Sequence, residues 1–334
     1  MLTVFDPRQQ AHAPAQELHN GSWSPHADVA ARAEMILAAV GPTRPPRDFG
    51  LAPLLAVHDA GYVDFLQTAF ERWQAAGRPG EAIGYAWPVV ARRRIAPDRI
   101  DALLGRYSFD AVTPIGPGTW DAAHAGAQTA LEALQAVLDG EDRAAFALCR
   151  PPGHHAGADY LGGYSYLNNV AIAAEAAVRA GRRVAILDVD YHHGNGTQDI
   201  FWDRGEVFFA SLHADPATDY PFYWGREDET GGGAGAGATL NIVLPHGTAI
   251  GAYLAALDRA LAAIRDFAPD LLLVSFGADT FVDDPLCHFA IRTADYAAMA
   301  APIAALGLPT VVVMEGGYAV DALGANVAGF LSTF

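Results

Sequence analysis

The sequence contains little cysteine and little positive charge, and each shortage excludes a class of protein. Only Cys149 and Cys287 occur among 334 residues, and they form no CxxC pair, so neither a disulfide scaffold nor a thiolate zinc protein is expected. The 21 Lys and Arg residues are outnumbered by 38 Asp and Glu, which gives a formal net charge of −17. Such a surface repels phosphate backbones and attracts cations. The charge therefore argues against a nucleic-acid partner.

Long apolar runs are also missing. No stretch approaches the roughly 20 apolar residues that a membrane span needs, and the N-terminal segment lacks the basic and apolar pattern of a secretion signal. We therefore expect a cytoplasmic protein with no membrane partner. Because 51% of the residues are hydrophobic and 18% are charged, the chain can bury a sizeable core and is not intrinsically disordered.

The chain alternates short apolar runs with alanine-rich stretches. The apolar runs predict strands at 144–148, 184–188, 207–213, 239–244, 271–276 and 309–314. The alanine-rich stretches predict helices at 120–138, 168–180, 250–267 and 295–305. Nearly continuous apolar strands are typical of a parallel sheet that is covered on both faces. The pattern predicts one α/β domain over residues 1–334, a doubly wound parallel sheet with helices on both faces.

Two segments depart from this alternation. Residues 78–118 are rich in Pro, Gly, Arg and aromatic residues and include Arg92–Arg94. This segment is too long for an ordinary connection, so we expect it to be functional or to form an interface. Residues 231–237 are glycine-rich, but they precede a strand rather than follow one and lack a Lys-Ser/Thr ending, so a flexible surface loop is expected instead of a phosphate-binding loop.

Polar side chains follow four of the predicted strands. The four clusters are Arg150-Pro-Pro-Gly-His154-His155, Asp188-Val-Asp190-Tyr-His192-His193-Gly-Asn195, Ser275-Phe-Gly-Ala-Asp279 and Glu315-Gly-Gly-Tyr318. Ligands of open α/β sheets bind outside the carboxyl ends of the strands. We therefore expect the four clusters to converge on one crevice.

Three residues of these clusters can form a metal site. Asp190 and His192 share a face of an extended chain, because residues i and i+2 point to the same side. Asp279 would supply a third ligand and leave a coordination position open for water or substrate, as in catalytic sites. This carboxylate-rich set suits Zn²⁺ and also Fe²⁺ or Mn²⁺. Each motif alone is a weak signal, so the hypothesis depends on the convergence of the clusters.

Five segments together carry a family resemblance: RPPGHHAG, GGYSYLNN, ILDVDYHHGNGTQDIF, FFASLHADP and VMEGGY. With them the chain resembles the histone-deacetylase-like amidohydrolases of the arginase/deacetylase superfamily. Gln16-Glu17-Leu18 and the long segment 78–118 are similar to the branch that acts on acetylated polyamines in bacteria. In that branch the segment caps the active site of a dimer partner, which implies a homodimer or a higher homo-oligomer.

The resemblance implies a role for each matching residue. The implied zinc ligands, with Fe²⁺ as the alternative metal in the cell, are Asp190, His192 and Asp279. The implied catalytic residues are the histidine dyad and its partners together with the carbonyl-binding tyrosine: His154, His155, Asp188, Asn195 and Tyr318. The implied substrate-binding residues are Glu17 at the cavity mouth, the carbonyl of Gly163, and the aromatic walls Tyr164 and Tyr220. A structural K⁺ or Na⁺ ion is implied at Asp188, Asp190, His192, Ser211 and Leu212.

Two further positions are compared with the family pattern, Asn195 and Asp101. Asn195 stands where an Asp is common in those enzymes, although Asn is usual in the amidohydrolase branch. Asp101 lies near a position where polyamine enzymes carry an acidic residue.

The two neighbouring histidines are expected to differ in charge. A carboxylate stabilises imidazolium, so His154 beside Asp188 should stay protonated, whereas His155 beside the uncharged Asn195 should more easily be neutral. A neutral His155 can take a proton from the attacking water and deliver it to the leaving amine. Tyr318 would donate a hydrogen bond to the oxyanion, and a divalent metal would polarise the acetyl carbonyl.

The sequence thus predicts a zinc-dependent amidohydrolase that deacetylates a small cationic amine such as acetylputrescine or acetylcadaverine. A deacetylase of acetyl-lysine side chains or of another small amide is the first alternative, and it would need an open rim. A ligand-binding relative without catalysis would be expected to lack a metal ligand, a histidine or the tyrosine. An arginase-like ureohydrolase with two Mn²⁺ ions would need more bridging carboxylates and another histidine ligand.

Overall fold

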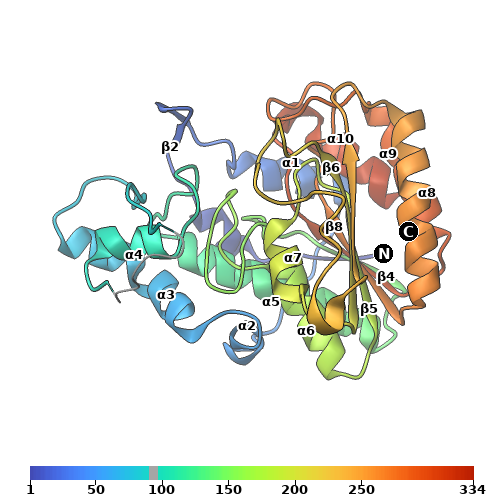
Figure 1. The fold of residues 1–334 in the computed structure, drawn as a ribbon, viewed down its shortest axis with the longest axis horizontal. Helices are drawn as coiled ribbons and strands as arrows, with labels where there is room; N and C mark the ends of the chain where they lie inside the picture. Colours follow the sequence, from blue (N-terminus) through green and yellow to red (C-terminus); the bar gives the residue numbers. More distant parts are fainter. Residues whose placement is uncertain (90–96) are drawn as a thin grey trace.

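A seven-stranded parallel sheet forms the centre of the computed structural model, which describes residues 1–89 and 97–334 (Figure 1). The strand order is β1-β4-β9-β8-β5-β6-β7, and every neighbouring pair is parallel. The strands are β1 (Leu2–Val4), β4 (Ala144–Ala147), β5 (Val184–Asp188), β6 (Val207–Ala214), β7 (Thr239–Leu244), β8 (Leu271–Phe276) and β9 (Thr310–Met314). The predicted fold class is confirmed.

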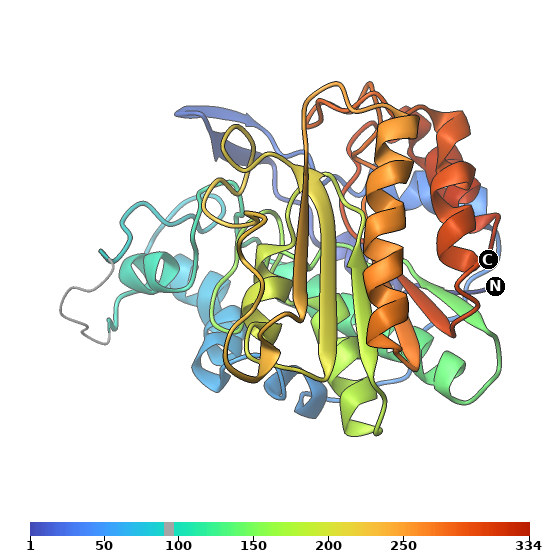
Figure 2. The ribbon, with the colours of Figure 1, turned by 45° about the vertical axis from the view of Figure 1, so that its right-hand side comes forward.

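Helices cover both faces of the sheet (Figures 1 and 2). One face is covered by α1 (Ala31–Val40), α8 (Ile250–Phe267), α9 (Tyr296–Ala304) and α10 (Val320–Leu331). The opposite face is covered by α5 (Thr119–Leu138), α6 (Asn169–Arg179) and α7 (Asn195–Phe201). The sheet is therefore the middle of three layers.

The double coverage explains the nearly continuous apolar strands. Along β5, Ala185 and Leu187 belong to the core under α8, α9 and α10, whereas Val184 and Ile186 belong to the core under α5 and α6. Alternate residues of a strand point to opposite faces. A central strand with both faces covered therefore needs an apolar residue at almost every position.

An extension beside the sheet completes the fold. The helices α2 (Ala52–Leu55), α3 (Ala60–Ala75) and α4 (Ile100–Arg106) pack near α5 around a third core. A two-stranded antiparallel hairpin of β2 (Gln16–His19) and β3 (Ser22–Pro25) projects from the same side of the molecule (Figure 2). Short 3₁₀ turns lie at Pro7–Ala11, Gly233–Gly235 and Thr293–Asp295.

The predicted strands and helices agree closely with β4 to β9 and with α5, α6, α8 and α9. Our predictions from the sequence do not include the β1 strand, the β2–β3 hairpin, the helices before residue 119, α7 or α10. The glycine-rich residues 231–237 are not simply a loose loop: they contain a 3₁₀ turn in which Gly235 is buried, and the Gly232 N–H donates to the Trp202 carbonyl at 2.8 Å. Glycine is needed there because a Cβ at either position would clash with residues 202–204.

Two expectations on domain organisation stay predictions. These are the single domain over 1–334 and the place of segment 78–118 at a dimer interface. The described part of that segment includes α4, whereas Arg92–Arg94 lie outside the described residues. Across the described chain, no helix combines the length and the apolar character needed to cross a membrane.

Candidate active site

The strand order brings the four polar clusters together. They follow β4, β9, β8 and β5, which are neighbours in the sheet. Because all four strands are parallel, their carboxyl ends lie at one edge. Hydrogen bonds link the clusters there: the Gly153 N–H donates to Glu315 Oε2 at 2.6 Å, and the Tyr191 N–H donates to Asp279 Oδ1 at 2.9 Å. The predicted convergence is confirmed.

A cavity of about 320 Å³ opens at this edge of the sheet. Its wall comes from the β2–β3 hairpin, from residues near 110, and from the loops after the sheet strands. The residues are Leu18, His19, Asn20, Phe109, Asp110, Val112, His155, Gly163, Tyr164, His192, Tyr220, Pro221, Phe222, Tyr223, Leu286 and Tyr318. The predicted tunnel residues Gly163, Tyr164 and Tyr220 thus share one cavity with three residues of the predicted reaction centre.

The predicted metal ligands lie together, and His192 brings this group to the cavity wall. One ligand atom each of Asp190, His192 and Asp279 lies within 4.8 Å of the other two. His192 Nδ1 is 3.1 Å from Asp279 Oδ2 and 3.4 Å from Asp190 Oδ1. Backbone N–H groups of His192 and Gly316 each donate to Asp190 at 2.9 Å, so this carboxylate is held in position by its own loop and by the loop after β9.

The electrostatics of these three residues favour a cation. Burial, together with the charge of Asp190, raises the pKa of Asp279 to about 7. Burial would lower the pKa of His192, but its hydrogen bonds to Asp190 and Asp279 and the negative charges of these two residues raise it to about 10. A positive charge is therefore stabilised between the two buried carboxylates. Two carboxylates and one imidazole are a suitable donor set for Zn²⁺, Fe²⁺ or Mn²⁺, so the residues fit a divalent ion.

The histidine dyad has the two partners expected from the sequence. His154 Nδ1 lies 2.9 Å from Asp188 Oδ2, and His155 Nδ1 lies 2.7 Å from Asn195 Oδ1. Burial would lower the pKa of His154, but the charges of Asp190 and Asp188 raise it to about 10. Burial and the positive charge of His154 hold the pKa of His155 well below its usual value. Since the Asn195 oxygen is an acceptor, the His155 proton sits on Nδ1 and its Nε2 is free to accept one.

Tyr318 is held in position by Asp284 and by Arg32. Its backbone N–H donates to Asp284 Oδ2 at 2.6 Å. The Arg32 guanidinium lies 4.8 Å from the centre of its ring and donates to the carbonyls of Gly317 at 2.6 Å and Glu315 at 2.7 Å. Burial raises the pKa of the Tyr318 hydroxyl well above its usual value, so this group keeps its proton and can act as a donor.

Asp110 is a residue of the cavity wall that holds two of its neighbours in place. Its Oδ2 accepts from the Tyr220 hydroxyl at 2.8 Å and from the Gly163 N–H at 2.7 Å. Gly163 has a φ of +54°, and a Cβ at this position would clash with the His155 ring. Asp110 therefore fixes two of the predicted substrate-binding residues, although no sequence pattern in its segment had identified it.

The structure changes the interpretation of two acidic residues. Glu17 is only 2% exposed and is not part of the cavity lining; it accepts a hydrogen bond from the Tyr164 hydroxyl at 3.0 Å. Glu17 is therefore not a solvated surface charge. It contacts the cavity wall by its hydrogen bond with Tyr164. Asp101, on α4, is paired with Arg78 at 2.8 Å and Arg99 at 2.9 Å and does not line the cavity.

The residues of the expected monovalent-ion site come from two neighbouring strand ends. Asp188 at the end of β5 is the register partner of Ser211 on β6, and Leu212 follows Ser211 directly. Asp190 and His192 lie in the loop after β5. Ser211 Oγ is also 2.8 Å from His213 Nδ1. The structure thus gathers the five residues in one region without identifying an ion.

Several buried residues that support the site had no assigned role in the sequence. Glu315 Oε2 accepts from the backbone N–H groups of Gly153 and His154, so it orients the start of the dyad. Arg150 is 1% exposed and contacts Asp28 Oδ1 at 3.1 Å. Glu315 and Arg150 stand in polar clusters after strands, which was a usable signal. Asp28 lies in a segment without any such pattern.

The comparisons with known proteins agree with this geometry. The family described as histone deacetylase domain matches residues 26–334. The chain belongs to the histone deacetylase family. Family members include acetylpolyamine amidohydrolase 1 of Pseudomonas aeruginosa, which is 48% identical over 100% of this chain and 99% of its own length. The acetylpolyamine amidohydrolase of Mycoplana ramosa is 46% identical over 99% of this chain and 98% of its own length.

A solved structure leads to the same family. The crystal structure of acetylpolyamine aminohydrolase from Burkholderia pseudomallei matches with a TM-score of 0.95 at 43% sequence identity. The match covers 100% of this chain and 98% of that one. The chain is therefore a hydrolytic enzyme of the histone deacetylase family that acts on amide bonds.

Proposed function

We propose that this enzyme is a zinc-dependent amidohydrolase that removes the acetyl group from small cationic amines, with acetylated polyamines such as acetylputrescine and acetylcadaverine as substrates. The observation that carries the proposal is that the candidate metal ligands, the histidine dyad and the tyrosine lie together and that His192, His155 and Tyr318 line one cavity. The names of the full-length relatives support the substrate class. The net charge of −17 supports a cationic substrate.

The metal ion would be held by Asp190, His192 and Asp279. When bound there, a divalent ion polarises the acetyl carbonyl and makes a water molecule more acidic. The Nε2 of the neutral His155 accepts the proton of the attacking water and later delivers it to the leaving amine. The protonated His154 stabilises the negative charge that develops beside it.

Two further groups act on the amide. The Tyr318 hydroxyl, which keeps its proton, donates a hydrogen bond to the oxyanion of the tetrahedral intermediate. The Gly163 carbonyl accepts the hydrogen bond of the substrate amide N–H and so aligns the scissile bond. Breaking the C–N bond then releases acetate and the free amine.

The amine chain of the substrate would lie between aromatic walls. Tyr164 and Tyr220 flank the cavity, and each donates its hydroxyl proton to a carboxylate, Glu17 and Asp110 respectively. Negative charge is therefore placed behind both walls. An alkyl chain with a distal ammonium group fits such a lining, because the rings contact the methylene groups and the carboxylates attract the charge.

A structural K⁺ or Na⁺ ion at Asp188, Asp190, His192, Ser211 and Leu212 is part of the proposal. So is a homodimer in which segment 78–118 lies at the interface. The second point is supported by exposed aromatic residues in the described part of the segment: Tyr85 is 67% exposed and Trp87 is 41% exposed. A cytoplasmic location stays a prediction.

A substrate panel tests the proposed function. The purified enzyme, with its metal content measured, would be assayed with acetylputrescine, acetylcadaverine, acetylated spermidine, an acetyl-lysine peptide and an uncharged acetamide. We expect the highest kcat/KM for the acetylated diamines. A higher kcat/KM for the peptide would support the acetyl-lysine alternative instead. No turnover of any substrate by fully metal-loaded protein would identify a ligand-binding relative.

A further inference from the structure

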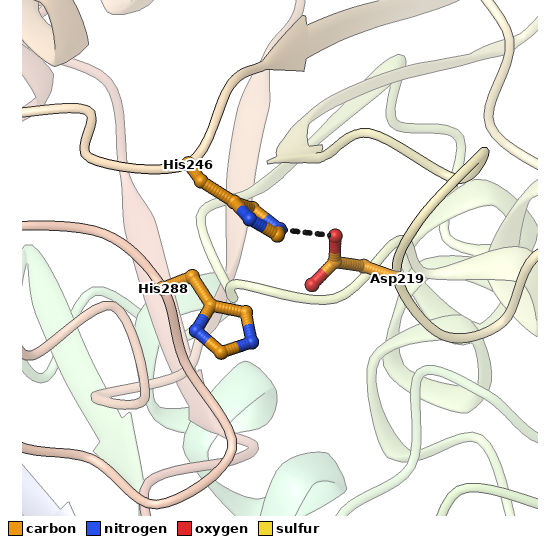
Figure 3. Close-up of side chains that lie close together, drawn as sticks. All are labelled: Asp219, His246 and His288. Carbon is orange, nitrogen blue, oxygen red and sulfur yellow. Dashed lines mark hydrogen bonds and ion pairs between the residues drawn. The ribbon is translucent and has the colours of Figure 1, made fainter.

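Asp219, His246 and His288 lie together outside the active site (Figure 3). One ligand atom of each lies within 4.8 Å of the other two. The three residues come from the loop after β6, the turn after β7 and the loop after β8. Figure 3 shows Asp219 and His246 pointing toward each other with the His288 ring beside them, and the two ring centres are 4.5 Å apart.

The geometry points to a second divalent-metal site, formed by Asp219, His246 and His288, that ties two loops of the cavity wall together. Two imidazoles and one carboxylate are a donor set that Zn²⁺ prefers. Three protein ligands, two of them exposed, leave open positions for water and make the ion exchangeable. This site shares no residue with the Asp190, His192 and Asp279 group.

The carboxylate of Asp219 is held ready to ligate. Its Oδ1 accepts from the buried Tyr191 hydroxyl at 2.5 Å, and its Oδ2 accepts from Thr218 at 2.6 Å. Such outer hydrogen bonds orient ligating carboxylates in metal sites. Within the described part of the chain, the exposed His288 ring makes no hydrogen bond that would compete with an ion.

The ligand atoms lie close to the spacing that a bound Zn²⁺ ion requires. His246 Nε2 lies 2.6 Å from Asp219 Oδ2, a hydrogen-bond distance. Zinc bonds of about 2.0–2.2 Å in a tetrahedral arrangement separate neighbouring ligand atoms by roughly 3.3 Å. The two atoms must therefore move apart by less than about 1 Å. The His246 side chain is 47% exposed and is free to make this movement.

The proposed second site lies next to residues of the cavity wall, so an ion bound there would affect the wall. Asp219 directly precedes Tyr220, and His288 lies two residues after Leu286; both Tyr220 and Leu286 line the cavity. The Tyr191 that supports Asp219 precedes the ligand His192. An ion bound here would cross-link the loops on this side of the substrate site and make their mobility depend on free Zn²⁺.

Equilibrium titration with Zn²⁺ tests the site. We expect two ions per wild-type chain and one per chain for His246→Ala and for His288→Ala, with at least a tenfold loss of affinity at the second site. His124→Ala, a histidine variant on α5 away from both groups, should still bind two ions. Asp279→Ala should retain the second ion, which separates this site from the proposed catalytic one. Unchanged stoichiometry and affinity in both His246→Ala and His288→Ala would overturn the proposal.

Amide hydrogen exchange tests the link to the cavity wall. Raising Zn²⁺ from one to two equivalents should slow exchange several-fold in residues 215–223 and 284–289 of the wild type, and not in His288→Ala. Binding of the second ion without slower exchange in these residues would overturn the cross-link. Because both histidines are exposed, thermal unfolding of the metal-free variants should match that of the wild type.

Discussion

At the scale of single residues, the reaction chemistry depends on which partner each side chain faces. His154 and His155 are adjacent and both buried, yet a carboxylate lies behind one and an amide behind the other. The resulting pKa directions are opposite. In the proposed reaction, His154 therefore supplies a positive charge, while His155 has a free nitrogen for proton transfer. Tyr318 complements them as a donor that does not ionise.

Replacing Asp279 by Ala should empty the proposed catalytic metal site. Two remaining ligands hold a divalent ion poorly, so dialysed Asp279→Ala should contain little metal by elemental analysis. Asp101→Ala, which removes an acid outside the cavity, should keep the wild-type content. Nearly full occupancy in dialysed Asp279→Ala would show that the ligand set is wrong.

The variant Tyr318→Phe should fold normally and keep its metal, while kcat falls about 10²–10³-fold. This is the usual loss when one oxyanion donor is removed. Steady-state kinetics and metal analysis on the same sample check both parts. Retention of more than half of the activity would contradict the role of Tyr318 in carbonyl activation.

His155→Ala should be at least as damaging to kcat as Tyr318→Phe. It removes the nitrogen that accepts the proton of the attacking water. His124→Ala, a change of the same type outside the cavity, serves as the kinetic control. Equal rates for His155→Ala and the wild type at saturating substrate would exclude the proton-transfer role.

At the scale of elements, the β2–β3 hairpin forms part of the cavity wall and also supports Tyr164 through Glu17. The hairpin places Leu18 and His19 in the lining and turns the Glu17 carboxylate toward the Tyr164 hydroxyl. Burial raises the pKa of Glu17, and the nearby Asp110 charge adds to this, against hydrogen bonds from Tyr164 and Ala27. The negative charge of the hairpin therefore develops at higher pH than that of an exposed glutamate.

Glu17→Gln should raise KM for acetylated diamines several-fold and barely change the kinetics of an uncharged acetamide. The variant keeps an acceptor for Tyr164 but removes the charge, which acts strongly in a partly enclosed site. In the wild type, KM for the cation should fall as pH rises through the raised pKa of Glu17, and this selectivity should weaken with added salt.

Asp101→Asn is the matched control for Glu17→Gln, since Asp101 is paired outside the cavity. It should leave the preference for cations unchanged. Equal effects of Glu17→Gln on charged and uncharged substrates would remove the polyamine claim and leave the amidohydrolase mechanism intact.

At the scale of the whole molecule, buried neutral histidines outside the reaction centre couple stability to pH. Burial lowers the pKa of His58 to about 4 and that of His213 to about 4, from ordinary values of 6.5. Each ring nitrogen of neutral His58 has a hydrogen-bond partner. Its Nδ1 lies 2.9 Å from the Gly157 carbonyl oxygen, and its Nε2 accepts from the Asn168 N–H at 3.0 Å. Protonation would break such an arrangement.

The free energy of unfolding should therefore fall as the pH drops from about 6.5 toward 4. In that window the unfolded chain binds protons that the folded chain does not, so the stability present above pH 6.5 is lost on acidification. Each such histidine contributes a slope of up to about 1.4 kcal/mol per pH unit. Urea unfolding at a series of pH values measures this slope. His58→Gln should have a smaller slope, and an identical one would contradict the assignment.

Much of the fold and of the reaction centre could be predicted from the sequence, because that information is local. A buried parallel strand needs apolar side chains on both faces, so β5 and β8 are visible as continuous apolar runs. The proposed metal ligands and the proposed dyad follow such strands closely, where their backbone is fixed by the sheet. The residue types and spacing of Asp190, His192 and Asp279 therefore predicted a metal site, whereas the role of the dyad was implied by the family resemblance.

The tertiary structure alone decided which distant segments meet. Only the strand order makes β4, β9, β8 and β5 neighbours, and only packing against Tyr164 and Tyr220 turns Glu17 into a buried residue and Asp110 into a wall residue. Asp219, His246 and His288 are likewise far apart in the sequence. Contacts of this kind depend on how separate loops pack, and packing energies between distant residues leave no periodic pattern in the chain.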